Sequence, residues 1–295
     1  MPQTSPPSES TPAAGLLGVR DHSRDAAGLR YVYPVVSRRA QGLSIGINLN
    51  TNNACNWACS YCQVPGLSRG AAPPVDLALL RSELQGFLDQ VFAGDFLATR
   101  VPAGMRRVND VAFSGNGEPT ASPQFAAAVD AVLAELARWP QAAPLKIVVI
   151  SNGSRAHRPE VLAALGRLAE RRGELWFKLD RGLAEGRRRV NGVALSDRLV
   201  VERLVAASAR IPTWVQTCLF AEDGQAPPAA ELQAYLALLA GARRRGARLC
   251  GVLLYTLARP SLQPGAEHLS PLPLDALAGW AEALRASGLE VRVSA

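Results

Sequence analysis

The chain has 295 residues and a mass of 31.3 kDa, with 48% hydrophobic residues, which is enough to bury the core of one barrel-sized domain. Its five cysteines are too few, and odd in number, for a disulfide framework, nothing in the sequence resembles a secretory signal, and no run of about 20 apolar residues predicts a membrane span. We therefore expect a cytoplasmic protein with reduced thiols and no membrane partner. The net charge of +7 is less informative, because the arginines are dispersed along an Arg- and Ala-rich chain.

The predicted elements begin after residue 28. Residues 1–28 are expected to form a disordered N-terminal tail, because residues 1–14 are rich in Pro, Ser and Thr, and residues 29–295 are expected to form one catalytic domain. Strands are predicted at 43–50, 108–114, 145–151, 174–180, 211–220, 248–256 and 289–294. Helices are predicted between them, at 75–92, 122–138, 158–171, 196–209, 229–246 and 273–287. This alternation predicts an α/β fold with a parallel sheet, and six such units fit a partial (β/α)6 barrel that is open at one side.

Three of the five cysteines lie in one short segment. Cys55, Cys59 and Cys62 have the spacing C-x3-C-x2-C, and an aromatic residue, Tyr61, precedes the last of them. Three thiolates on one loop can hold three corners of a cubane iron–sulfur cluster, whose ligands are normally four cysteines, and leave the fourth iron open. Zinc is the main alternative, but it needs a fourth ligand and favours paired ligand motifs, and the two other cysteines are isolated in apolar runs. The spacing therefore favours an open iron–sulfur cluster.

A second motif follows the strand predicted at 108–114. Residues 114–119 read Ser-Gly-Asn-Gly-Glu-Pro, a glycine-flanked turn that carries one carboxylate, Glu118. Glycine allows the backbone to approach a ligand closely, so the main-chain groups around Gly115 and Gly117 suit the ammonium of an amino-acid moiety. Alone, such a turn is more often an ordinary strand-to-helix loop with a solvated carboxylate. Its position about fifty residues after the cysteines favours the functional interpretation.

The two motifs together resemble those of the radical S-adenosylmethionine (SAM) superfamily. The C-x3-C-x-aromatic-C loop of that superfamily corresponds to Cys55, Cys59, Tyr61 and Cys62, and its glycine-rich turn corresponds to residues 115–119. Residues 40–295 look like the stand-alone iron–sulfur oxidoreductases related to the wyosine synthases of tRNA, through the segments at 176–180, 189–192, 216–217 and 255–260. The resemblance implies that the partial, TIM-like barrel is a radical SAM core domain.

The resemblance also implies the cofactors and their ligands. One 4Fe–4S cluster would be held by the three cysteines and would bind SAM through its open iron, and a one-electron donor such as flavodoxin or ferredoxin would reduce it. Reductive cleavage of SAM would then yield a 5′-deoxyadenosyl radical that abstracts hydrogen from a substrate. Gly115, Gly117 and Glu118 would bind the methionine amino group, and Tyr61 would approach the adenine through its backbone.

Four further candidates lie at the carboxyl ends of predicted strands, at the edge where the loops of β/α barrels assemble an active site. Ser151 and Asn152 offer hydroxyl and amide groups that suit a ribose or a carboxylate, although an Asx turn or a helix cap is an equally common use of such residues. Lys178 and Asp180 share one face of their strand, and Lys178 is one of only two lysines in the chain. They are the candidate catalytic residues, which would position the substrate or hold the cofactor, and the alternative is a structural ion pair.

The motifs do not identify the substrate. Wyosine synthases carry additional cysteines before the radical motif, and residues 1–54 contain none, which argues against that reaction. Dispersed Arg pairs, among them Arg38-Arg39, can contact phosphate, yet no RNA-binding module is evident, so a small-molecule substrate is favoured over RNA. Three alternatives remain: a tRNA-base-modifying enzyme, an activating enzyme for a glycyl-radical protein, and a non-catalytic metal-binding module with zinc in the cysteine loop.

Overall fold

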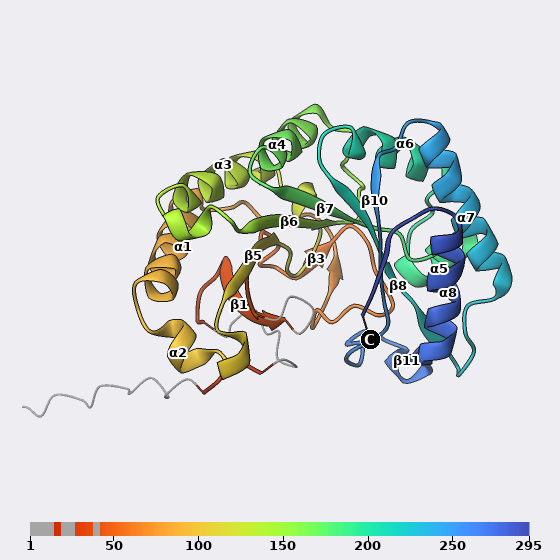
Figure 1. Cartoon of the computed structure of the whole chain (residues 1–295), viewed down its shortest axis with the longest axis horizontal. Helices are drawn as coiled ribbons and strands as arrows, with labels where there is room; N and C mark the ends of the chain where they lie inside the picture. The colour runs from red at the N-terminus through yellow and green to blue at the C-terminus, as the bar shows by residue number, and fades with distance from the viewer. Residues whose placement is uncertain (1–14, 19–26, 38–41, 295) are drawn as a thin grey trace, which may run out of the picture.

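A curved sheet of seven parallel strands and one antiparallel strand forms the centre of the protein (Figure 1). The structure is a computed structural model, and it describes residues 15–18, 27–37 and 42–294. The strand order is β1-β2-β5-β6-β7-β8-β10-β12, and β1 pairs antiparallel with β2 at one edge. The bounds are β1 Val32–Ser37, β2 Gly42–Ile47, β5 Val108–Phe113, β6 Lys146–Ser151, β7 Gly173–Lys178, β8 Thr213–Cys218, β10 Leu249–Tyr255 and β12 Val291–Ser294.

The helices that connect the strands cover the outer, convex face of the sheet (Figure 1). Their bounds are α1 Leu77–Phe92, α3 Phe125–Leu136, α4 Pro159–Ala169, α6 Asp197–Ser208, α7 Ala229–Arg244 and α8 Leu274–Ala286. In α1, Asp76 caps the first turn, because its side chain accepts hydrogen bonds from the N–H groups of Ala78 and Leu79 (3.0 Å each). The buried residues of α1 recur at helical spacing, at Leu80, Leu84, Phe87, Leu88 and Val91.

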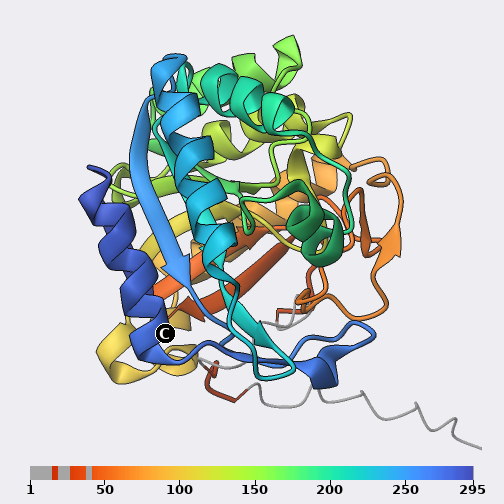
Figure 2. The same cartoon turned by 90° about the vertical axis from the view of Figure 1, so that its right-hand side faces the viewer.

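The predicted fold class, a partial α/β barrel, is confirmed. Every predicted strand and helix is present, with ends that differ from the predicted ones by at most three residues. The strand predicted at 211–220 ends at Cys218, since Phe220 starts a separate short strand, β9 (Phe220–Glu222), which pairs with β11 (Leu269–Pro271). Figure 2 shows this pair, in cyan and blue, just beyond the carboxyl end of β10.

Several smaller elements were not predicted from the sequence. They are β1, α2 (Phe96–Arg100), α5 (Ala184–Asn191) and the parallel pair of β3 (Ala54–Cys55) and β4 (Ser68–Arg69). The α5 segment reads Ala-Glu-Gly-Arg-Arg-Arg-Val-Asn, and its charged residues hide any apolar period. β1 contains Pro34, which lowers the strand propensity of the segment and is compatible only with a position at the edge of a sheet. Two of these elements, β3 and α5, hold the cysteine loop.

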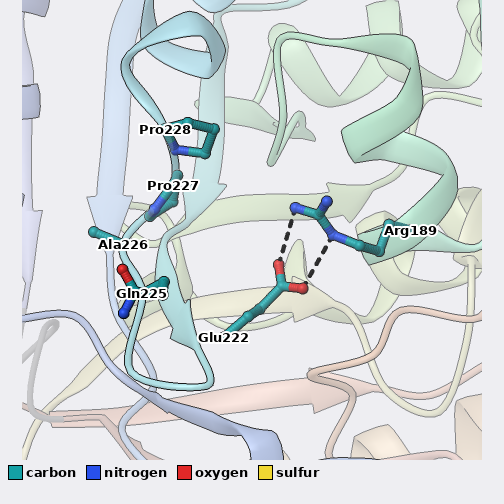
Figure 3. A pocket seen from close by; sticks show the side chains of 6 residues that line it. All are labelled: Arg189, Glu222, Gln225, Ala226, Pro227 and Pro228. Carbon is teal, nitrogen blue, oxygen red and sulfur yellow. Dashed lines mark hydrogen bonds and ion pairs between the residues drawn. The ribbon is translucent and has the colours of Figure 1, made fainter.

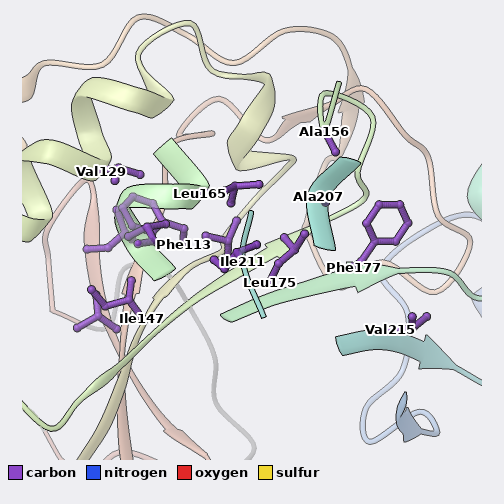
Figure 4. Close-up of a cluster of buried hydrophobic side chains, with 14 of the residues drawn as sticks. Phe113, Val129, Ile147, Ala156, Leu165, Leu175, Phe177, Ala207, Ile211 and Val215 are labelled. Carbon is purple, nitrogen blue, oxygen red and sulfur yellow. The ribbon is translucent and has the colours of Figure 1, made fainter. Parts of the chain in front are cut away.

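Strand side chains alternate between two environments, because successive residues of a strand point to opposite faces. On β6, Ile147 and Val149 are buried in the core between the sheet and the helices, whereas Val148 and Ile150 line a cavity on the inner face. Figure 4 shows part of that core, including Phe113, Val129, Ile147, Leu165, Leu175 and Phe177. Each large apolar side chain that is fully buried contributes about 1.5–3 kcal/mol, so the strands that frame the cavity are firmly held.

Part of the predicted N-terminal tail lies outside the described residues, namely 1–14 and 19–26, and so does Arg38-Arg39. In the segment 15–18, Leu17 is buried, and its N–H donates a hydrogen bond to the carbonyl oxygen of Arg100 (2.8 Å). Within the described ranges, every helix is too short or too polar to cross a bilayer.

Candidate functional site

The concave face of the sheet encloses a cavity of about 940 Å³. Inner-face residues of neighbouring strands line its middle: Gly46, Ala112, Val148 and Trp176. In closed β/α barrels, bulky side chains fill the corresponding space. Here Gly46 and Ala112 are small, so part of the space stays open. At the carboxyl ends of the strands the same cavity is lined by most of the predicted site residues: Cys55, Cys59, Cys62, Tyr61, Gly115, Gly117, Glu118, Asn152 and Lys178.

The three motif cysteines lie on the loop that begins with β3. The N–H of Trp57 donates to Sγ of Cys55 (3.4 Å), and the N–H of Cys62 donates to the carbonyl oxygen of Cys59 (3.0 Å), so the loop is a compact turn. Burial raises the pKa of the Cys55 thiol to about 11 and the pKa of the Cys59 thiol to about 12. Thiolates at this site at neutral pH therefore require a strong positive charge beside them, such as a metal centre.

The donor set suits a cluster better than a single ion. Within the described ranges, no three His, Cys, Asp or Glu side chains converge closely enough to hold one metal ion. A zinc ion needs four ligands around one centre, whereas each cysteine of a cubane cluster binds a different iron, so its sulfur atoms stand farther apart. Cys55, Cys59 and Cys62 lie on one loop and line one cavity, so they supply the three thiols that such a cluster needs. Of the other two cysteines, Cys218 is fully buried on β8 and Cys250 lies on β10.

The end of α5 holds the cysteine loop through main-chain atoms. The N–H of Ala58 donates to the carbonyl oxygen of Asn191 (3.1 Å), and the N–H of Ser60 donates to that of Val190 (2.8 Å). Gly192 ends the helix in the left-handed region (φ +64°), which favours glycine. In the sequence, segment 189–192 contributes only to the family resemblance. Its residue types do not predict a contact with the cysteine loop.

Asp180 lies at the centre of a buried hydrogen-bond network behind the cavity wall. Its Oδ2 accepts from the hydroxyl of Tyr61 (2.6 Å) and from Nδ2 of Asn191 (2.7 Å). Its Oδ1 accepts from the N–H of Cys218 (2.8 Å) and lies 3.1 Å from Nζ of Lys178. Burial acts to raise the pKa of Asp180, but Lys178 and these donors outweigh it, so the pKa is lowered and the carboxylate is ionised.

Lys178 brings the positive charge of this network to the cavity. Its Nζ donates to the hydroxyl of Tyr255 (2.8 Å) and lies 5.0 Å from the ring centre of Tyr61. Burial acts to lower the pKa of Lys178, but Asp180 raises it, so the ammonium keeps its proton. The predicted Lys178–Asp180 proximity is therefore present, with the ammonium at the cavity and the fully buried carboxylate behind it.

Glu118 connects the glycine-rich turn to the end of β6. Its Oε1 accepts from the hydroxyl of Ser151 (2.7 Å) and from the N–H of Thr120 (3.0 Å), and its Oε2 accepts from the N–H of Asn152 (2.6 Å). Burial raises the pKa of this carboxyl group. The Asn152 side chain in turn donates to Oδ1 of Asn56 (2.9 Å), inside the cysteine loop. Ser151, Asn152 and Glu118 thus join three loops around the cavity.

The two glycines of the turn are required by contacts within the protein. A Cβ on Gly117 would lie 2.3 Å from the carbonyl oxygen of Ala54, directly before Cys55, and one on Gly115 would lie 2.4 Å from Oδ1 of Asn48. Gly115 also has a φ of +132°, which disfavours any other residue. The Asn48 side chain, which sequence reasoning missed, accepts from the N–H of Asn116 (3.1 Å). The turn therefore packs directly on the cysteine loop.

A smaller pocket of about 230 Å³ lies beside α5 and β9 (Figure 3). Arg189 and Glu222 form a two-point ion pair across it, with Nε–Oε2 at 3.0 Å and Nη2–Oε1 at 3.3 Å. None of its lining residues is a predicted site residue, so the cavity at the cysteines is the candidate active site.

Comparison of the sequence with protein-family models and with curated proteins finds no match. Among solved structures, the chain is similar to a radical SAM methyltransferase from Sphaerobacter thermophilus, with a TM-score of 0.57, 16% identity, and coverage of 89% of this chain and 68% of the other. Two further similar structures have TM-scores of 0.44. One is a domain of a pyruvate-formate lyase-activating enzyme from Bacteroides vulgatus (15% identity, 63% of this chain, 99% of the other), and one is an archaeal TYW1 (14% identity, 83% and 72%). At these identities the likeness concerns the fold.

Proposed function

Because the chain has the radical SAM fold, we propose that it is a radical SAM enzyme whose single 4Fe–4S cluster is held by Cys55, Cys59 and Cys62. The observation that carries the proposal is that these three thiols and the glycine-rich turn line one cavity at the carboxyl ends of the strands. When bound, the cluster and SAM supply a 5′-deoxyadenosyl radical by reductive cleavage of the sulfonium. Every other contribution comes from the residues of the barrel.

The cavity wall offers groups that suit the parts of SAM. The main chain at Gly115 and Gly117 lines the cavity and would accept from the methionine ammonium, while Glu118 fixes the turn. The ammonium of Lys178 would hold a carboxylate or orient the substrate, and Asp180 would keep that ammonium charged and in place. For Tyr61 we propose contact with the adenine through its backbone, because its hydroxyl already donates to Asp180.

A small molecule is the substrate class that the cavity favours. The space of about 940 Å³ lies inside the barrel and is bounded by strand side chains such as Val148 and Trp176. A pocket of this size holds a cofactor and a compact ligand. We propose a flavodoxin or ferredoxin as the one-electron donor, because acidic proteins of that kind complement the basic charge of the chain.

The test is anaerobic reconstitution with iron and sulfide, followed by dithionite and SAM. We expect one cluster per chain and formation of 5′-deoxyadenosine even without substrate, detected by chromatography. The Cys59→Ala protein is the negative control. A fully loaded, reducible cluster that yields no deoxyadenosine would refute the radical mechanism, and a protein that binds zinc in place of the cluster would support the non-catalytic alternative.

A further inference from the structure

The side chain of Asn191, the last residue of α5, contacts Cys59, the central cysteine of the loop. Its side chain is buried, with 1% of the residue exposed. The Nδ2 atom donates one hydrogen bond to Sγ of Cys59 (3.4 Å) and one to Oδ2 of Asp180 (2.7 Å). One amide group therefore bridges a candidate cluster ligand and a buried carboxylate.

The two acceptors fix the orientation of this amide. A carboxylate only accepts hydrogen bonds, and a sulfur atom bound to iron has no proton to donate. Exchanging the nitrogen and oxygen of Asn191 would place its carbonyl oxygen against both acceptors. In the orientation present, Oδ1 of Asn191 is buried and has no hydrogen-bond partner within the described ranges. Such unsatisfied atoms are rare in folded proteins, and a redox role is one of the explanations for them.

Attachment of the loop does not require this side chain. The hydrogen bonds from the N–H groups of Ala58 and Ser60 end on main-chain oxygens of α5, so any residue at position 191 that keeps the helix would preserve them. Arg69 contributes another link, from Nη2 to the carbonyl oxygen of Gly192 (2.6 Å). What the Asn191 side chain adds is an N–H group directed at the sulfur.

We infer that Asn191 is a positioning residue that raises the reduction potential of the iron–sulfur cluster by donating a hydrogen bond to the Cys59 thiolate. A reduced cluster carries more negative charge on its sulfur atoms, and a donor directed at one of them stabilises that state. The carboxylate of Asp180 holds the donor in place through its own 2.7 Å hydrogen bond. The inference rests on the proposed function, since it requires a cluster on Cys59.

The test is an anaerobic redox titration of the reconstituted protein, followed by electron paramagnetic resonance. The variant is Asn191→Leu, which keeps a similar volume without donors. A hydrogen bond of ordinary net strength changes an equilibrium constant about fivefold, so the one-electron reduction of the variant should be about fivefold less favourable, which is about 40 mV more negative. Asn191→Thr keeps a hydroxyl donor, and its potential should lie between the two.

Asn52→Ala is the matched control, because Asn52 lies just before β3 and its side chain bonds main-chain groups, not a thiol: Nδ2 donates to the carbonyl oxygen of Ala71 (3.1 Å), and Oδ1 accepts from the N–H of Ala54 (3.2 Å). Its potential should equal that of the parent. A loaded Asn191→Leu protein with the parent potential overturns the inference and leaves the proposed function intact. If the leucine variant binds no cluster, the threonine variant decides: a potential equal to that of the parent, or a shift no larger than that of Asn52→Ala, overturns the inference. A parent protein without iron and sulfide refutes the proposed function, and the inference with it.

Discussion

The hydroxyl of Tyr61 donates a 2.6 Å hydrogen bond to Oδ2 of Asp180, across 119 residues of sequence. Tyr61 lies inside the cysteine motif, and Asp180 lies two residues after the end of β7, so this contact fixes the cysteine loop to the carboxyl end of a central strand. The ring of Tyr61 also packs on Phe220 with a centroid distance of 5.5 Å. The aromatic residue of the motif therefore has a structural role in addition to the cofactor contact that we propose for it.

Tyr61→Phe should weaken the fold without disturbing the packing of the ring. The change removes a hydrogen bond to a charged group, which is worth about 1.5–3 kcal/mol. Urea denaturation of the two proteins would measure the difference in the free energy of unfolding. Tyr33→Phe is the matched control, because the hydroxyl of Tyr33 bonds a neutral partner, the hydroxyl of Ser114 (2.7 Å), and its loss should cost less. An equal or larger loss in Tyr33→Phe would contradict this account.

Asp180→Asn should destabilise the protein by about 3–5 kcal/mol, since it leaves the buried ammonium of Lys178 without its counter-charge. Asp130→Asn removes an exposed ion pair with Arg167 (2.7 Å) and should cost at most about 1 kcal/mol. Urea denaturation at pH 7 would separate the two cases. A change below about 1 kcal/mol in Asp180→Asn would mean that the pair is not required for folding.

The same variant should alter the acid dependence of stability. The pKa of Asp180 is lowered in the folded protein, so its carboxylate contributes stability above its unfolded pKa of about 3.9 and loses it as the pH falls through the folded value. The difference in unfolding free energy between parent and Asp180→Asn should therefore be constant from about pH 5 to 7 and shrink below about pH 4. A difference that grows on acidification would reverse the assigned sign.

Cys59→Ala should lose most of the cluster and keep the fold, because each thiolate supplies one of only three protein ligands. Iron and sulfide analysis after anaerobic purification would measure cluster content, and circular dichroism would confirm the fold. Cys250→Ala should retain one cluster, since Cys250 lies on β10 away from the loop. Equal iron and sulfide in Cys59→Ala and the parent would contradict the ligand assignment, and loss of iron in Cys250→Ala would reveal a second site.

Gly117→Ala should impair both cluster and SAM binding. The resemblance assigns this turn to the methionine amino group of SAM, but the new Cβ would also lie 2.3 Å from the carbonyl oxygen of Ala54 and would displace the residue before Cys55. Gly166→Ala, in α4, meets nothing within 4 Å and is the control. Iron content and equilibrium dialysis with SAM would give the two affinities. Full cluster content with weakened SAM binding would show that the loop yields to the extra methyl group.

Binding to bulk tRNA should be weak and without selectivity. If RNA were the substrate, several arginines would contact phosphates, and log affinity would fall by roughly 0.7–0.9 per contact for each log unit of salt. A salt titration would measure this slope, with untargeted metabolite profiling of a deletion strain beside it. Tight, selective tRNA binding and a missing modified nucleoside would overturn the preference for a small molecule. A metabolite that accumulates, and that the purified enzyme consumes, would support it.

The alternation of strands and helices was predictable because the long elements carry clear apolar patterns: α1 has apolar residues at helical spacing, and β6 is a short continuous apolar run. The cysteine ligands were predictable because an iron–sulfur cluster requires thiols at a characteristic spacing. The turn was predictable because only glycine allows the backbone to approach a neighbouring group closely. The hydrogen-bond partners of Glu118 and Asp180 could not be predicted from the sequence. A hydrogen bond such as that from Asn191 to Asp180 depends on how separate loops meet in the folded protein. A polar helix such as α5 gives no periodic signal of its own.

Both lysines of the chain face the cavity, one at each end of its wall. Lys178 is nearly enclosed, with 12% of its side chain exposed, and holds its proton tightly, whereas Lys146 pairs with Glu174 (2.6 Å) and has 42% of its side chain exposed. An amine-selective reagent would therefore attach to the side chain of Lys146 before any other side chain. Lys146 is a native attachment point for a fluorophore or a spin label on the cavity wall, where the label would report on ligand entry.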